Sequence, residues 1–256
     1  MLQTAIEATH RAGRVIAKRY PETRDVSVKG YRDIVTATDR EAEDAILNVI
    51  QERFPDHAIL SEEAGEVGSE SEYTWVVDPL DGTSNYAHRI PVFSVSIGVL
   101  SQGTPMIGVI HDPLRQQTFV AERDGGARLN GAPMQTSSVT EMSHALIGLD
   151  WGHQDVVRAQ VLAALQRIAP HCGTVRGLGS AALALAYVAA GWMDTYFNLG
   201  LKPWDTAAGQ LLVEEAGGRC TTLDGALYRI DAADCLASNG LFHESLLSML
   251  SPRQHD

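Results

Sequence analysis

A buried strand that ends in two carboxylates is the most informative segment of this sequence. The apolar run from Trp75 to Val77 leads directly into Asp78, and a second carboxylate, Asp81, follows three residues later. Carboxylates held this close repel each other, and a hard divalent cation converts that cost into binding energy. Leu80, which lies between them, offers its main-chain carbonyl as a further oxygen ligand. The segment therefore predicts a divalent metal site at the end of a strand.

The residues after Asp81 are typical of a turn that binds phosphate. Gly82 lets a phosphate oxygen approach the main chain closely, and a helix that begins after it would point free amide groups at the phosphate. The alternative is an acidic turn in which Asp81 and Gly82 serve only the backbone geometry. The unbroken string from Asp78 to Tyr86 favours the functional interpretation.

Two more acidic positions come from distant parts of the chain. Glu62 follows the short apolar run from Ala58 to Leu60, where it would reach the same metal. Asp205 is expected at the N-cap of a helix, a position that favours Asp without any metal. Each position alone therefore has an ordinary alternative, a solvated acidic loop for Glu62 and a plain helix cap for Asp205.

Hydrophobic periodicity predicts an α/β fold in two parts, an α+β half over 1–131 and an α/β half over 132–256. The first part is expected to hold two helices, the second of them opened by a capping box of Thr38 and Glu41. A mainly antiparallel sheet follows these helices, and the second part alternates strand and helix. The predicted helices are 2–20, 42–50, 156–168, 181–190, 206–216 and 241–250, and the predicted strands are 58–60, 75–77, 92–100, 105–111, 117–122, 127–129, 145–148, 193–197, 219–222 and 235–237.

Composition limits the partners of the protein. The formal net charge is −12, which argues against binding nucleic acid through a general basic surface. No segment is apolar for long enough to cross a bilayer, and the N-terminus lacks the pattern of a secretory signal. The three cysteines, Cys172, Cys220 and Cys235, show no metal-type pairing. We expect reduced thiols in a cytoplasmic protein that binds neither nucleic acid nor a membrane.

Taken together, the motifs resemble the inositol monophosphatase family of lithium-sensitive, magnesium-dependent phosphatases. The resemblance implies a layered αβαβα sugar-phosphatase sandwich, usually a homodimer, that hydrolyses a small phosphate monoester. It covers nearly the whole chain and rests on the strings Asp33–Asp39, Glu62-Glu63, Trp75–Tyr86, Gly108–Gly131, Arg176–Ala182 and Trp204–Gly218.

The resemblance also implies a role for individual residues. Two or three Mg²⁺ ions would be held, the first by Glu62, Asp78 and the Leu80 carbonyl, the second by Asp78, Asp81 and Asp205. Asp39 and Thr83 would orient and deprotonate a metal-activated water, with Glu62 assisting. The implied substrate contacts are Gly82, Thr83, Ser84, Gly179, Ser180, Ala181, Asn198 and Lys202.

One position departs from the family pattern and bears on the substrate. Inositol phosphatases of this family usually carry a Glu where this chain has Asn198, and Lys202 adds a positive charge nearby. Inositol 1-phosphate remains the first expectation, with fructose 1,6-bisphosphate, histidinol phosphate and adenosine 3′,5′-bisphosphate as alternatives. A different class, a regulatory binding protein on the same fold, also remains open, because some bacterial relatives are associated with the transcription machinery.

Overall fold

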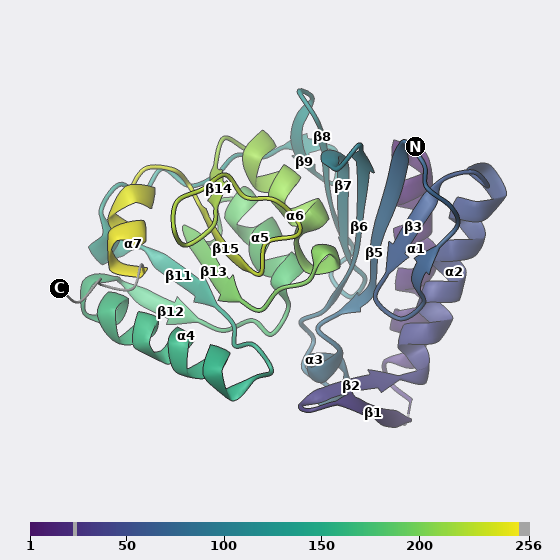
Figure 1. The fold of residues 1–256 in the computed structure, drawn as a ribbon, viewed down its shortest axis with the longest axis horizontal. Coiled ribbons are helices and arrows are strands. Elements are labelled where there is room, and N and C mark those ends of the chain that lie inside the picture. The colour runs from purple at the N-terminus through teal and green to yellow at the C-terminus, as the bar shows by residue number, and fades with distance from the viewer. Residues whose placement is uncertain (23–24, 251–256) are drawn as a thin grey trace.

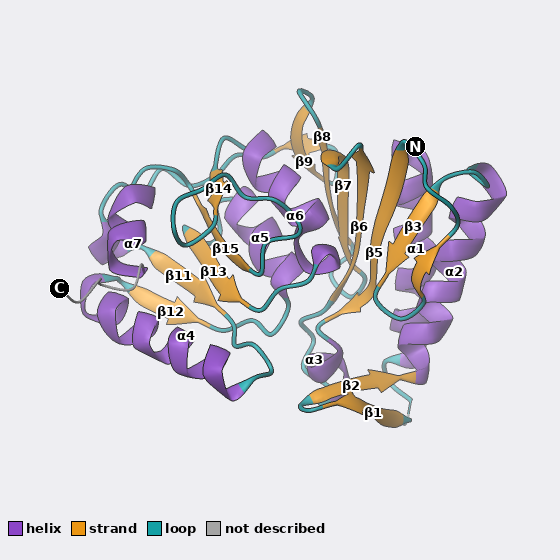
Figure 2. Ribbon diagram, in the orientation of Figure 1, coloured by secondary structure: helices purple, strands orange, loops and turns teal. Residues whose placement is uncertain are grey.

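The chain forms five layers of alternating helix and sheet in a computed structural model that describes residues 1–22 and 25–250 (Figures 1 and 2). A helix pair covers the outer face of a large sheet, a second pair lies between the two sheets, and a third pair covers the outer face of a smaller sheet. This arrangement is the predicted αβαβα sandwich. The helices are α1 (Leu2–Arg19), α2 (Ala37–Arg53), α3 (Thr83–Ala87), α4 (Asp155–Ile168), α5 (Ala181–Ala189), α6 (Pro203–Glu215) and α7 (His243–Leu250), with 3₁₀ turns at Met142–His144 and Ala169–His171.

The large sheet is antiparallel except at one pair of strands. Its order is β10-β9-β8-β7-β6-β5-β3-β4, and only β3 and β5 run parallel among its described strands. Parallel neighbours end at the same edge of a sheet, so the residues that follow β3 and those that end β5 are brought together. The strands are β3 (Ala58–Ser61), β4 (Gly65–Val67), β5 (Tyr73–Asp81), β6 (Ser94–Ser101), β7 (Thr104–Asp112), β8 (Gln117–Glu122), β9 (Gly126–Leu129) and β10 (Ala132–Pro133).

The small sheet follows in the second half of the chain. Its order is β12-β11-β13-β15-β14, with β11 parallel to β12 and β13 and the remaining pairs antiparallel. A separate hairpin of β1 (Val26–Gly30) and β2 (Asp33–Thr36) stands apart from both sheets, beside α3 (Figure 1). The strands of the small sheet are β11 (Leu146–Leu149), β12 (Thr174–Arg176), β13 (Thr195–Leu199), β14 (Arg219–Thr221) and β15 (Asp234–Ser238).

Apolar side chains fill the three interfaces between the layers. One cluster joins α1 and α2 to the large sheet, a second surrounds α5 and α6, and a third joins α4 and α7 to the small sheet. The central helix α5 is apolar on nearly every side, as expected for a helix that packs between two sheets. Gly98 and Gly108 let α6 approach the large sheet: a Cβ at Gly108 would lie 2.5 Å from the Ala208 carbonyl oxygen.

Several predicted details were wrong. The capping box of α2 consists of Thr36 and Asp39, not Thr38 and Glu41, and Asp205 is the third residue of α6, with Lys202 at the N-cap. The exposed hairpin β1–β2 was missed because all five residues of β1 face solvent, which leaves no alternation of apolar and polar residues to detect. The short strands β4, β10 and β12 were also missed. No helix in the described residues is long and apolar enough to span a membrane.

Candidate active site

Strand β5 delivers Asp78 and Asp81 into one pocket through an irregularity in its pairing. Residues three apart on a regular strand point to opposite faces. Here Asp78 pairs with Ser96 and Asp81 with Ser94, so three steps along β5 match two along β6. The extra residue is the feature of a β-bulge, and it returns both carboxylates to the same face. Both side chains line a pocket of about 500 Å³ between the two sheets.

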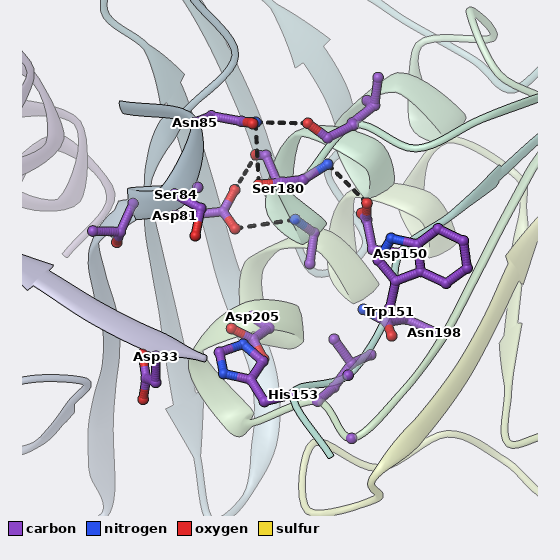
Figure 3. A pocket seen from close by; sticks show the side chains of 18 of the residues that line it. Asp33, Asp81, Ser84, Asn85, Asp150, Trp151, His153, Ser180, Asn198 and Asp205 are labelled. Carbon is purple, nitrogen blue, oxygen red and sulfur yellow. Dashed lines mark hydrogen bonds between the residues drawn. The ribbon is translucent and has the colours of Figure 1, made fainter. Parts of the chain in front are cut away.

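Asp81 is held by the start of α5. Ser94 Oγ donates a hydrogen bond to Asp81 Oδ2 (3.1 Å), Ser180 Oγ donates to the same oxygen, and the Ala181 amide donates to Oδ1 (3.0 Å; Figure 3). Burial raises the pKa of Asp81, and these hydrogen bonds work in the opposite direction. Two of the predicted substrate contacts, Ser180 and Ala181, therefore also fix a carboxylate in place.

The carboxylates Asp78, Glu62 and Asp205 come together from β5, the turn after β3 and α6. Burial, followed by the charges of Glu62, Asp81 and Asp205, raises the pKa of Asp78 well above its usual range. Burial likewise raises the pKa of Glu62 to about 7 and that of Asp205 to about 8, and neighbouring carboxylates add to both shifts. These groups stay charged at neutral pH only if a positive charge joins them.

Glu62 already has a cationic neighbour. The amide of Glu62 donates to the Val77 carbonyl (3.1 Å), which places its side chain at the edge where β3 and β5 end. Lys29 Nζ, from the β1–β2 hairpin, lies 3.1 Å from Glu62 Oε1 and 2.5 Å from Glu63 Oε1. The hairpin thus supplies a positive charge that partly offsets the acidic edge.

Asp39 and Thr83 are brought together, as predicted for a pair that handles a water molecule. The Thr83 hydroxyl lies 2.9 Å from Asp39 Oδ1 and 3.0 Å from the Leu80 carbonyl, so its single proton serves one of the two at a time. Asp39 Oδ2 accepts from the Thr36 amide (2.8 Å) and the Thr36 hydroxyl (2.5 Å). Burial raises the pKa of Asp39.

Gly82 makes the turn between β5 and α3. Its φ of +92° lies in the left-handed region, and a Cβ there would meet the Val92 and Gly179 carbonyl oxygens at 3.0 and 3.1 Å. Only glycine fits such a position without strain. Asn85 holds the same region, because its amide nitrogen donates to the carbonyls of Val92 (2.8 Å) and Leu178 (2.7 Å). Ser84 also lines the pocket.

Of the other predicted substrate contacts, Asn198 and Gly179 line the pocket and Lys202 does not. Asn198 lines the pocket, but its amide nitrogen donates to the Tyr196 hydroxyl (2.9 Å) and its oxygen accepts from the Leu199 amide (2.7 Å). Lys202 is exposed and does not line the pocket, and its main-chain amide donates to Asp205 Oδ2 (2.6 Å). Gly179 lines the pocket and donates its amide to Asp150 (2.7 Å).

Sequence reasoning missed Asp150 and Trp151. Asp150 follows β11 and lines the pocket, where burial, followed by the charge of Asp81, raises its pKa to about 7. Its other oxygen lies 3.3 Å from the Tyr196 hydroxyl. The available signal was the one used for Asp78, an acid directly after an apolar strand. Figure 3 shows the Trp151 indole across the pocket from Asp81 and Ser84.

The donor set fits Mg²⁺, the ion that the resemblance implies. Asp78, Asp81, Asp205 and Glu62 offer hard oxygen ligands, and their mutual repulsion is the cost that a divalent cation removes. Among the described residues, no three His, Cys, Asp or Glu side chains already form a metal site. Each of the four instead accepts a hydrogen bond from a protein donor, so phosphate and water oxygens would have to supply part of any ligand sphere.

The comparisons with known proteins agree on one family. The model of the inositol monophosphatase family matches residues 1–255. The Nus factor SuhB of Salmonella typhimurium is 38% identical over 260 residues, which span 100% of this chain and 97% of the relative. The inositol-1-monophosphatase of Mesorhizobium japonicum is 38% identical over 255 residues, which span 96% of this chain and 94% of the relative.

Solved structures show the same fold. The extragenic suppressor protein SuhB of Bartonella henselae superimposes with a TM-score of 0.94 at 35% identity, over 98% of each chain. An IMPase/NADP phosphatase solved with Mg²⁺ and phosphate superimposes with a TM-score of 0.84 at 28% identity, over 94% of this chain and 91% of that one.

Proposed function

This chain belongs to the inositol monophosphatase family, and from that premise we propose that it hydrolyses a small-molecule phosphate monoester in a Mg²⁺-dependent reaction. The observation that carries the proposal is the gathering of Asp78, Asp81, Asp205 and Glu62 in one pocket, where each has a raised pKa. Buried carboxylates that lie close together repel each other in their charged form, and a bound cation removes this repulsion. Inositol 1-phosphate is the reference substrate.

In this proposal the four carboxylates and the Leu80 carbonyl would hold Mg²⁺. The ion would offset the negative charge that develops on the phosphate oxygens during phosphoryl transfer. Ser180 and the Ala181 amide hold the Asp81 carboxylate in the pocket, where it would bind the ion. A solved family structure with Mg²⁺ and phosphate supports the choice of metal.

Thr83 and Asp39 act on the attacking water. When Thr83 donates its proton to Asp39, a lone pair of its oxygen is free to accept a hydrogen bond from water in the pocket. A proton of the water then passes to Thr83 as the Thr83 proton moves to Asp39. The raised pKa of Asp39 favours the last transfer, because a more basic carboxylate takes up a proton more readily.

A second candidate function is regulatory binding, which the name of the Nus factor SuhB relatives favours. The carboxylate pocket and the Asp39–Thr83 pair support catalysis instead, because a protein that only binds a partner has no need of either. The two functions are compatible in one molecule, and the first is the one that the pocket supports.

Phosphate release from a panel of esters tests the proposal. The panel contains inositol 1-phosphate, fructose 1,6-bisphosphate, histidinol phosphate and adenosine 3′,5′-bisphosphate, each with Mg²⁺ and with excess EDTA. We expect release from at least one ester with Mg²⁺ and none after chelation. If no ester is hydrolysed even at high Mg²⁺, the proposal fails and regulatory binding becomes the leading function.

A further inference from the structure

Two arginines line the pocket among its acidic residues. One of them, Arg158, comes from α4, next to loop 150–153, and Figure 3 places Trp151 and Asp150 of this loop across the pocket from Ser84 and Asp81. The acidic residues that line the pocket are Asp33, Glu62, Asp78, Asp81, Asp150 and Asp205, and the arginines that line it are Arg32 and Arg158.

Arg32 already has partners. It sits at the tip of the β1–β2 hairpin with a φ of +60°, and its Nη1 donates to Asp155 Oδ1 (2.6 Å) and to the His153 carbonyl (3.2 Å). Its charge is therefore used to connect the hairpin to the start of α4.

Arg158 is different, because one end of its guanidinium is anchored and the rest is available. Its Nε donates to the Gly152 carbonyl (2.9 Å), which fixes the group beside loop 150–153. Across the described residues, Arg158 has no carboxylate within ion-pair distance, although α4 carries Asp155 three residues earlier. A guanidinium has five N–H donors, so the remaining nitrogens can hold an anion in a forked geometry.

We propose that Arg158 binds a second anionic group of the substrate, on the side of the pocket that loop 150–153 forms. The proposal rests on the proposed function, because it assumes that the scissile phosphate lies beside Asp78, Asp81 and Asp205. Asp150 also lines the pocket, and a carboxylate accepts hydrogen bonds from hydroxyl groups. The substrate class is therefore a sugar or polyol with two anionic groups.

The experiment compares two esters that differ only in the second phosphate, fructose 1,6-bisphosphate and fructose 1-phosphate. The measured quantity is the ratio of kcat/KM for the bisphosphate to kcat/KM for the monophosphate, at saturating Mg²⁺. We expect this ratio to fall about tenfold in Arg158→Gln, the size of one charge-assisted hydrogen bond. Product inhibition by fructose 6-phosphate, whose phosphate would bind to Arg158, is expected to weaken by a similar factor.

Arg11→Gln is the matched control. Arg11 lies on α1 and pairs with Glu7 on the surface, so this variant removes one positive charge from an acidic protein at a site unrelated to the pocket. Its ratio should equal that of the wild type. A ratio that is unchanged in Arg158→Gln, or reduced equally in both variants, would overturn the proposal.

Failure of the proposed function can be told apart from failure of this inference. If neither ester releases phosphate, the proposed function fails, and calorimetry with fructose 1,6-bisphosphate then decides the inference alone. Affinity about tenfold weaker in Arg158→Gln than in wild type would support the Arg158 subsite. Equal affinities, or no binding to the wild type, would overturn it.

Discussion

Asp39 combines a structural and a chemical task in one side chain. One carboxylate oxygen closes the capping box of α2 through Thr36, and the other receives the Thr83 hydroxyl. The cap fixes the rotation of the carboxylate, so the oxygen that faces Thr83 is held in place before any substrate binds. The resemblance alone assigned Asp39 and Thr83 to the attacking water. The capping box was assigned to Thr38 and Glu41, whereas the structure forms it from Thr36 and Asp39.

Removing the Thr83 hydroxyl tests the proton path. Thr83→Ala should lower kcat about 100-fold, the lower end of the range for general base catalysis, with little change in KM. Thr83→Ser is the control, since it keeps the hydroxyl and should stay within a few-fold of wild type. Steady-state phosphate release in the three proteins gives the answer. Equal kcat in Thr83→Ala and wild type would remove Thr83 from the mechanism.

His243 makes stability sensitive to acid. Its ring is buried and bonds the hydroxyls of Thr221 (2.9 Å) and Ser238 (2.7 Å), and burial, followed by the charge of Arg219, lowers its pKa to about 4. The unfolded chain has the ordinary pKa of about 6.5, so between these values it binds a proton that the folded protein does not. Stability is therefore lost as pH falls below about 6.5.

The size of this effect can be measured with one variant. Between pH 7.5 and 5, His243 should cost the wild type about 2 kcal/mol of unfolding free energy. His243→Gln removes the titration, so its stability should fall less over the same range, even if it starts lower at pH 7.5. Urea unfolding of both proteins at the two pH values is the measurement, and parallel losses would show that His243 is not responsible.

At the scale of elements, the bulge in β5 determines the site more than any single residue does. The sequence showed an acidic pair at the end of a strand, but three-residue spacing on a regular strand would have separated the two side chains. The pairing of Asp78 with Ser96 and Asp81 with Ser94 depends on how β5 aligns with β6, which is a tertiary property. Long periodic elements such as α1 and β7 were predictable because their apolar faces carry the signal locally.

The packing of α6 on the large sheet is the second element-scale feature. A Cβ at Gly108 would lie 2.5 Å from the Ala208 carbonyl oxygen and 3.1 Å from its Cα, both main-chain atoms that cannot rotate away. Gly108→Ala should therefore destabilise the protein by about 2 kcal/mol or more through overpacking.

Gly30→Ala is the control for this prediction, because the nearest atom to a Cβ there is 3.8 Å away. Its stability should stay close to that of wild type in urea unfolding. If Gly108→Ala were as stable as Gly30→Ala, the close approach of α6 to β7 would not exist in solution.

At the scale of the whole molecule, the fold was largely predictable and the pocket only partly so. The family resemblance implied the five layers, and the alternation of elements predicted the two halves. The carboxylates were found because each follows an apolar strand or opens a helix. Asp150 and Arg158 were missed, since a loop and a helix face in the second half reach the pocket only through the packing of the small sheet against α5 and α6. Lys202 showed the opposite error, since nearness in sequence to Asp205 did not place it in the pocket.

Phosphate release by Asp78→Asn at increasing Mg²⁺ tests the central claim most directly, using the best ester of the panel. Asp78 carries one of the charges that would hold the ion, and Asn replaces it at nearly equal volume. We predict no measurable phosphate release by the variant at Mg²⁺ concentrations that saturate the wild type. The variant should still fold, with an unchanged circular dichroism spectrum and a melting temperature no lower than that of the wild type. A near-normal rate in a folded Asp78→Asn protein would contradict the assignment of this pocket as the Mg²⁺ site.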